Sequence, residues 1–369
     1  MNHRTALGRW QGPPLQSVGQ TWDEQQDLGA LTTDRPLLTS ELFEGNGYYG
    51  FDLILKRYAD VAADYPLKAL VPHGITLDPG FVWKEERNAP LPGVLCYEPH
   101  RRRLYATACP KKVLAAASPY LYLLEMLPPP AGQDREGTLF FPSHSTHHIA
   151  AATSGFEAAA GALENLPSEA GPVRVCMYWR DLALGHDAPF RQRGFPIVSA
   201  GHIYDLAFPL RLHHLLQRHR YAAGNDLGSH MAHALASGCG YFHVGPPMHG
   251  RTDQLLRPAS RVGEVPWIRP DLSVVRPLYD RLVDVFGAPY PGDRAAQQEL
   301  SSYLLGRPAL QSPDVLRSTL EGLERDDRWG YRPTNGTRWF YRSPPRAARA
   351  AARVRSRLAL RRRLTSLRH

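Results

Sequence analysis

The chain lacks long hydrophobic runs and uses little cysteine. No apolar run reaches about 18 residues, so no transmembrane helix is predicted. The opening sequence MNHRTALGRWQGPP contains no apolar signal region, and we expect a cytoplasmic protein. The four cysteines are scattered without a CxxC pair, which indicates reduced thiols rather than disulfides or a zinc site.

Sequence signatures of several enzyme classes are also missing. The chain contains no GxSxG, no Walker A sequence and no HExxH, which argues against serine hydrolases, P-loop ATPases and zincins. Two histidine pairs, His144 with His148 and His230 with His233, can each share a helix face. Neither pair has a third ligand at metal spacing, so no metal site is predicted.

Acidic residues are missing from the C-terminal tail. Nine arginines and no acid follow from Arg346 onward, and subtracting them from the net charge of +9 leaves residues 1–345 formally neutral. A basic amphipathic helix on an anionic membrane surface is one interpretation of this tail. Nucleic-acid binding is a second interpretation, and a solvated tail without a partner is the third.

The composition predicts a packed α/β protein. Apolar residues make up 43% of the chain and charged residues 21%. Pro128–Pro130 and the polar residues that follow form the best linker. We therefore expect four regions: an extended or poorly ordered arm (1–35), an N-terminal α/β domain (36–130), a C-terminal α/β domain (137–330) and a basic tail (340–369).

Short strands alternate with helices in both predicted domains. The expected strands are 67–72, 93–97, 104–107, 138–141, 173–179, 196–199, the strand at Tyr221 and 239–244. The expected helices are 51–63, part of 113–127, 155–166, 206–218, the helix opening at Ser229, 271–286 and 313–323. This alternation predicts two Rossmann-like, doubly wound sheets facing a cleft, with ligands at the carboxyl ends of the strands.

The segment from Tyr221 to Pro246 is the best candidate for a phosphate site. Gly224 and Asn225 end a strand, and Gly228 and Ser229 open a short helix of small residues. A helix start without large side chains exposes its first N–H groups, which bind phosphate well. We expect Asn225, Gly228, Ser229 and His230 to contact the ligand.

A polar cluster follows the strand 138–141. Its residues Ser143, His144, Ser145 and Thr146 offer three hydroxyls and an imidazole at the strand end. A Ser/Thr cap of the next helix is the simpler interpretation, but a cap needs only one hydroxyl. We therefore predict that the cluster holds a phosphate, with His144 also a catalytic candidate.

Two further candidates could act as a base. His73 precedes Gly74 directly after a strand, and histidine can deprotonate a hydroxyl near neutral pH. Glu44 stands beside the glycine-rich run 45–50, which fails the GxGxxG pattern and is equally consistent with a tight turn. A loop histidine with no catalytic role is the alternative for His73.

Arg180 and His202 complete the candidate set. Arg180 follows the strand 173–179 and could bind a phosphate bidentately, or pair with neighbouring residues. His202, with Asp205, could contact a base or ribose, or cap the next helix.

The order FFPSHS, VCMYWRD, IVSAGH and AAGNDLGSHMAHALASGCGYFHVGP resembles the donor-binding half of GT-B glycosyltransferases. The nearest analogies are bacterial surface-polysaccharide transferases with cytidine-activated donors: Kdo and sialic acid transferases and teichoic acid glycerophosphotransferases. His73-Gly74, Ser143-His144 and the segment 225–229 resemble their motifs. Many nucleoside-diphosphate-sugar enzymes carry a glutamate after the start of the phosphate-binding helix. This chain has His233 or its neighbours there instead, which disfavours a UDP or GDP donor.

This resemblance implies transfer of a sugar, or a related group, from a nucleotide-activated donor, with CMP as the candidate nucleotide, to a glycan or lipid-linked acceptor. It implies that the N-terminal domain (36–130) lies on the acceptor side and that the C-terminal domain (137–330) binds the nucleotide donor. It also implies no metal or other cofactor, and a peripheral position at the inner membrane through residues 346–369. The alternatives are a pyruvyl transferase or epimerase of the same fold, and a nucleic-acid-binding or scaffold protein acting through its tail. The nucleic-acid alternative is disfavoured because the neutral core keeps its polar residues at strand ends, where a binding module does not need them.

Overall fold

The computed structural model describes residues 27–37, 39, 41–65, 67–77, 80, 82, 84–89, 91–109, 111–128, 134–145, 153–246, 248, 252–256 and 271–325. Thr146, most of the predicted N-terminal arm and the whole basic tail lie outside these residues. The roles expected for Thr146 and the tail therefore stay predictions.

The described strands form two parallel sheets. The first sheet has the order β1 (Ala69–Leu70), β2 (Gly93–Cys96), β3 (Lys112–Ala115). The second has the order β6 (Ile197–Val198), β5 (Val173–Cys176), β4 (Thr138–Phe141), β7 (Tyr221–Gly224), β8 (Gly240–His243). In the second sheet the chain runs outward from β4 in both directions, so its topological switch point lies between β4 and β7.

The predicted α/β class with parallel sheets is confirmed, and the second sheet has the doubly wound order. The described strands of the first sheet instead follow one another in chain order, without a switch. The expected strand at 104–107 is wrong, because these residues belong to helix α4 (Pro99–Ala108). Pro99 in the first helical turn is the start signal that outweighs the short apolar pattern.

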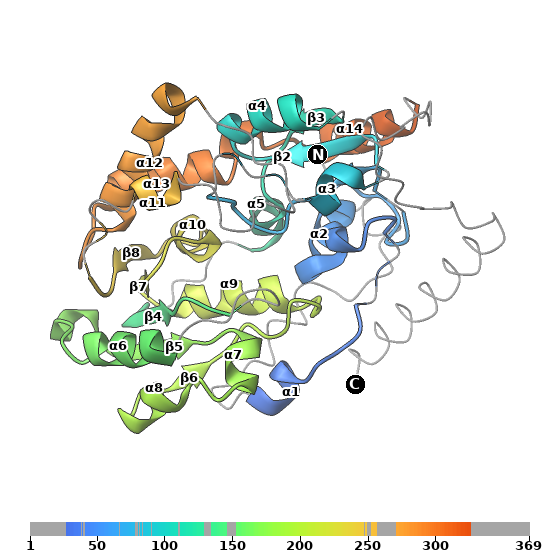
Figure 1. Ribbon diagram of the computed structural model, residues 1–369. Coiled ribbons are helices and arrows are strands. Elements are labelled where there is room, and N and C mark those ends of the chain that lie inside the picture. The colour runs from blue at the N-terminus through green and yellow to red at the C-terminus, as the bar shows by residue number, and fades with distance from the viewer. Residues whose placement is uncertain are drawn as a thin grey trace.

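Helices surround both sheets (Figure 1). The remaining described helices are α1 (Leu28–Thr32), η2 (Glu44–Gly50), α2 (Phe51–Tyr58), α3 (Lys84–Asn88), α5 (Pro119–Met126), α6 (Thr153–Leu163), η3 (Ser168–Ala170), α7 (Trp179–Ala183), α8 (Ala188–Gln192), α9 (Phe208–Arg218), α10 (Ser229–Ala236), α11 (Thr252–Leu255), α12 (Leu272–Phe286), α13 (Arg294–Leu304), η4 (Arg307–Ala309) and α14 (Pro313–Arg325). Side-chain caps fix several starts: Ser118 accepts from Tyr120 N, and Asp293 accepts from the second and third N–H groups of α13.

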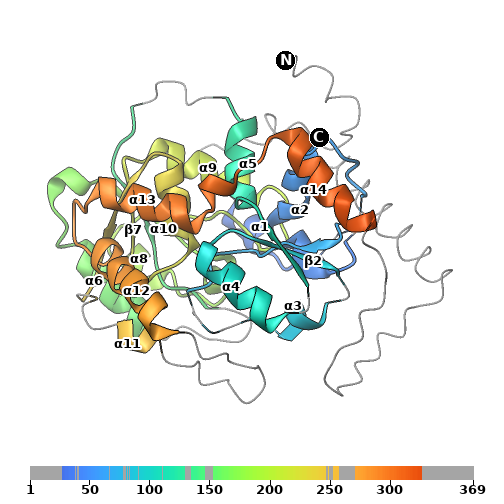
Figure 2. The same cartoon turned by 90° about the horizontal axis from the view of Figure 1, so that it is seen from above.

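Each end of the described chain packs on the opposite half. Helix α14, late in the sequence, lies beside α2 and the first sheet in both views (Figures 1 and 2). There Arg317 Nε donates to Ala59 O at 2.7 Å and forms an ion pair with Asp60. At the other end, α1 contacts α7, and Arg35 pairs with Asp205 at 2.9 Å.

One hydrophobic cluster is shared by the two sheets. It includes Leu95 of β2, Leu139 of β4, Ala222 of β7 and Leu316 of α14, all buried. The alternate strand residues face a second cluster on the outer side of the second sheet, built around Phe140, Val175, Ala223 and Phe242. Because the first cluster is continuous, separating the sheets would expose apolar surface of both, which is unfavourable.

A buried group of charges anchors the region before β1. Lys56 is fully buried, forms an ion pair with Glu41 and lies 3.0 Å from Asp52. Burial by itself would lower the pKa of Lys56, but the two carboxylates outweigh it and raise the pKa, so the ammonium stays charged. Glu41 also accepts from the side-chain nitrogen of Asn46, whose side-chain oxygen accepts from Val71 N.

Replacing Lys56 should therefore destabilise the protein strongly. Lys56→Met leaves two carboxylates buried without their cation, and we expect the free energy of unfolding to fall by about 3–5 kcal/mol in urea denaturation. The control Arg103→Met removes an exposed charge from α4 and should change the free energy of unfolding by less than about 0.5 kcal/mol. An unchanged urea midpoint for Lys56→Met would contradict this account.

Candidate functional site

The switch point of the second sheet joins two of the predicted ligand loops. At the ends of β4 and β7, Ser143 N donates to Asn225 Oδ1 at 2.6 Å. Ser143 Oγ lies 3.4 Å from a carboxylate oxygen of the exposed Asp226, which also accepts from Leu227 N. Asn225 thus positions the β4 loop. The carboxylate of Asp226 makes the immediate surroundings of Ser143 unfavourable for a phosphate.

The first turn of α10 lies against the loop that follows β1. Gly228 is its N-cap and makes no side-chain capping bond. First-turn N–H groups without such a cap bind water or an anion. The Ser229 hydroxyl accepts from Ile75 N at 2.8 Å, so the loop after β1 touches the first turn of α10. The structure therefore brings the predicted base loop and the predicted phosphate helix together.

The His230 ring packs against residues of β4 and β8. Its Nε2 shares a hydrogen bond of 3.2 Å with the Tyr241 hydroxyl, and its ring stacks on Phe141 at 5.1 Å. A Cβ on Gly224 would come within 2.5 Å of that Nε2, so glycine is needed there. Burial lowers the pKa of His230 to about 3, and a neutral imidazole brings no positive charge to a phosphate.

His73 is half-buried between aromatic rings. Its ring centroid lies 5.3 Å from that of Tyr48 and 6.4 Å from that of Tyr49. Burial lowers the pKa of His73 to about 4, so the imidazole is neutral at pH 7 and able to accept a proton. Glu44 is exposed on η2, and within the described part of the chain no hydrogen bond or ion pair joins it to His73.

The glycine-rich run 45–50 bridges the two halves. Tyr49 has a left-handed backbone, with φ of 57°, and its N–H donates to Ile203 O at 2.7 Å. Gly50, with φ of 68°, lies so close to Leu206 that a Cβ would approach its backbone to 3.2 Å. A left-handed non-glycine residue costs free energy, which the contacts to the second half offset.

A chain of aromatic contacts crosses this junction. Neighbouring ring centroids are 4.0 to 5.9 Å apart along the series His144, Tyr178, Trp179, His202, Tyr204, Tyr48, His73. It begins at the end of β4 and finishes at the end of β1. Such rings can stack against a planar base or the apolar face of a sugar.

Other predicted ligands have structural contacts. Ser145 is fully buried and its N–H donates to Asp181, whose second oxygen bonds His186 at 3.0 Å. His144 is exposed, with Nδ1 3.0 Å from Ser145 O. His202 is fully buried and its Nδ1 accepts from Tyr204 N at 3.0 Å. Binding roles for Ser145 and His202 stay predictions.

Arg180 lies at the start of α7 and is half-buried. Its Nε is shielded from solvent and has no hydrogen-bond partner among the residues that the structure describes. A shielded guanidinium N–H is costly unless it finds an acceptor. Arg180 therefore remains a candidate for the phosphate of a ligand at the ends of β4 and β5.

Sequence reasoning missed the aromatic residues of the junction. Tyr48, Tyr49, Tyr178, Trp179 and Tyr204 all lie within two positions of a predicted ligand or glycine turn. Their position next to those residues could have identified them as candidate site residues. Their mutual contacts depend on how the two sheets pack, which a linear pattern does not contain.

Within the described ranges, no group of three or more His, Cys, Asp or Glu side chains is arranged to hold a metal ion. None of the helices described is both long and apolar enough to cross a membrane.

No family model and no curated protein matches the chain. Among solved structures, the chain is similar to the pneumococcal O-GlcNAc transferase GtfA in complex with UDP and GlcNAc, with 12% identity and a TM-score of 0.36 over 74% of this chain and 55% of that one. It is also similar to a S. aureus TarM mutant (11%, 0.35, 74% and 53%) and to a variant of the wall teichoic acid polymerase TagF (8%, 0.28, 66% and 59%). The chain thus spans little more than half the length of these transferases, and the TM-scores are too low to support an argument about function.

The buried histidines of α10 should make stability depend on pH. His233 is 7% exposed, stacks on Tyr120 at 4.3 Å and has its pKa lowered by burial to about 3. The unfolded chain takes up this proton near pH 6.5, so the free energy of unfolding should fall as the pH drops from about 6.5 toward 3.

His233→Gln should make this loss shallower, by up to about 1 kcal/mol per pH unit between pH 6 and 4. Urea denaturation of both proteins across that range measures the slope. The difference between their free energies of unfolding at pH 7.5 reports the packing change alone. Identical pH slopes for the two proteins would contradict burial of a neutral His233.

Proposed function

We propose that the protein is a glycosyltransferase-like enzyme that transfers a sugar or related group from a nucleotide-activated donor. One observation supports this most: the switch point between β4 and β7 lies against the loop after β1, through the hydrogen bond from Ile75 N to Ser229 Oγ. Ligands of open parallel sheets bind at such switch points. A second sheet contributing a histidine to the same place allows a donor and an acceptor to meet there.

The residues suggest a division of labour for the donor. The uncapped N–H groups at Gly228 and Ser229 and the guanidinium of Arg180 would hold the phosphate. Asp226, beside Ser143, would accept from ribose hydroxyls rather than face the phosphate. The rings of Tyr178 and Tyr204 offer surfaces for the base or the sugar.

The chemistry would follow from this arrangement. Hydrogen-bond donors held around the departing phosphate stabilise the negative charge that develops on it as the bond between the sugar carbon and the phosphate oxygen breaks. His73, neutral at pH 7, would accept the proton of the attacking acceptor hydroxyl as the new bond forms. The lowered pKa makes His73 a weaker base in the free protein.

The finer assignments belong to the same proposal. A cytidine-activated donor, a glycan or lipid-linked acceptor of surface polysaccharide synthesis, and a cytoplasmic position at the inner membrane are suggested by the motifs at Ser143-His144 and 225–229 and by the nine arginines of the tail.

Nucleotide binding is the first prediction. We expect one of CMP, CDP, UDP and GDP to raise the melting temperature selectively in a thermal-shift assay of the full chain, because a ligand of the folded state stabilises it. Asp226→Ala should reduce that shift because it removes the contact proposed for the ribose. Ser229→Ala should reduce it because it removes the hydroxyl that holds the loop after β1 against the first turn of α10. A panel without any shift would contradict the proposal.

A role of His73 as base predicts a loss of rate without a loss of donor binding. His73→Gln should lower turnover about 10²- to 10⁴-fold and leave the nucleotide Kd unchanged. The matched control is His213→Gln on α9. Burial also lowers the pKa of His213 to about 4, but its ring lies 6.4 Å from Tyr120 and outside the aromatic chain. Equal turnover of the two variants would remove His73 from the mechanism.

A further inference from the structure

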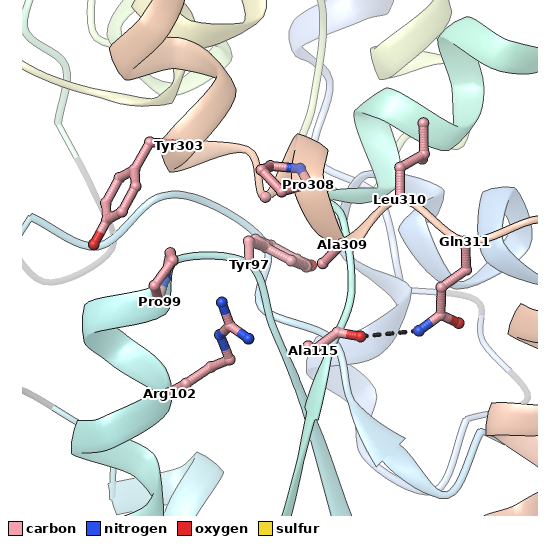
Figure 3. A pocket seen from close by; sticks show the side chains of 10 residues that line it. Tyr97, Pro99, Arg102, Ala115, Tyr303, Pro308, Ala309, Leu310 and Gln311 are labelled. Carbon is pink, nitrogen blue, oxygen red and sulfur yellow. Dashed lines mark hydrogen bonds between the residues drawn. The ribbon is translucent and has the colours of Figure 1, made fainter.

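A cavity lies at the carboxyl ends of β2 and β3, where the chain returns from α13 to α14. Its volume is about 360 Å³, which is in the range of small-molecule sites. The wall includes Tyr97 and Pro99 after β2, Arg102 of α4, Tyr303 of α13, and Pro308 and Gln311 of the returning segment (Figure 3). Segments far apart in the sequence thus enclose one space.

Arg102 supplies the cavity with a positive charge. Its guanidinium extends from α4 toward Tyr97 and Ala115 in Figure 3. The Nε of Arg102 is shielded from solvent and has no hydrogen-bond partner among the described residues. Among the described residues that line the cavity there is no aspartate or glutamate. A shielded N–H donor in a wall without carboxylates favours an anionic acceptor.

The opposite wall is aromatic and held in place. The Tyr303 hydroxyl accepts from His100 N at 3.2 Å, lies 3.2 Å from His100 Nδ1, and the two rings are nearly parallel. Gln311 Nε2 donates to Ala115 O at 2.9 Å, which fixes the returning segment against β3. The cavity therefore combines one cationic group with rigid aromatic and proline surfaces, a combination that suits a ring bearing an acidic group.

We propose that this cavity binds a small anionic ligand, with a phosphate or carboxylate on Arg102 and an attached ring against Tyr303 and Pro308. This inference does not depend on the proposed transferase activity. Tyr97 connects the cavity to the candidate base, because its hydroxyl donates to Pro72 O at 2.7 Å, one residue before His73. The anionic group could belong to the acceptor or to a free regulator.

Phenyl phosphate is a suitable probe because it combines both features. Titration calorimetry of the full chain at moderately high salt, which screens attraction to exposed arginines, should detect its binding. Arg102→Gln should weaken this binding at least about tenfold, as expected for loss of a charge-assisted pair. Arg103→Gln removes an exposed charge from the next position of α4 and should leave the Kd within about twofold.

Near-ultraviolet circular dichroism and melting temperature verify that both variants are folded. Equal affinity of Arg102→Gln and the parent protein would overturn the proposal. Equal weakening by Arg102→Gln and Arg103→Gln would also overturn it, because the attraction would then be a general effect of charge.

Steady-state kinetics of Arg102→Gln and the parent protein distinguish the two sources of the ligand, and this measurement alone rests on the proposed function. If Arg102→Gln raises the KM for the acceptor and leaves kcat unchanged, the anionic group belongs to the acceptor. If Arg102→Gln changes kcat, the anionic group belongs to a free regulator. Because calorimetry needs no turnover, failure of the cavity proposal and failure of the transferase proposal give different results.

Discussion

The hydrophobic cluster shared by the two sheets is the constraint on which the rest of the structure depends. Leu95, Leu139 and Leu316 belong to one buried cluster although they come from the first sheet, the second sheet and the last described helix. Burying that surface brings the loops at the strand ends into contact, at Ile75 with Ser229 and at Tyr49 with Ile203. The candidate site is thus a consequence of core packing, and its geometry is determined by elements outside it.

The junction combines neutral imidazoles with backbone donors. Burial lowers the pKa of both His73 and His230, so neither ring is charged at pH 7. For a phosphate bound at this junction, positive potential would come from the N–H groups at the start of α10 and from Arg180. Hydrogen-bond donors that the protein holds in place act more strongly where water is excluded than they do in water. An anionic ligand beside His73 would raise the pKa of the imidazole and so make it a stronger base.

Sequence patterns located most strands of the second sheet but not their neighbours. The strand 138–141 and the start of α10 at Ser229 follow from local periodicity and glycine placement, whereas the strand order with its switch between β4 and β7 was not predicted. The expected strand at 104–107 failed because a short apolar stretch fits either element, and Pro99 decided for a helix. The return of α14 to the first sheet, the aromatic chain and the cavity at Arg102 are tertiary contacts between distant segments, and no local pattern specifies them.

Hydrogen–deuterium exchange with and without the nucleotide that binds tests the central claim most directly, because it reports which backbone segments the ligand contacts. The account predicts that protection rises together at the start of α10, in the loop after β7 and in the residues 73–77 that follow β1. Protection confined to other segments, or none in these three, would contradict a donor site at the junction of the two sheets.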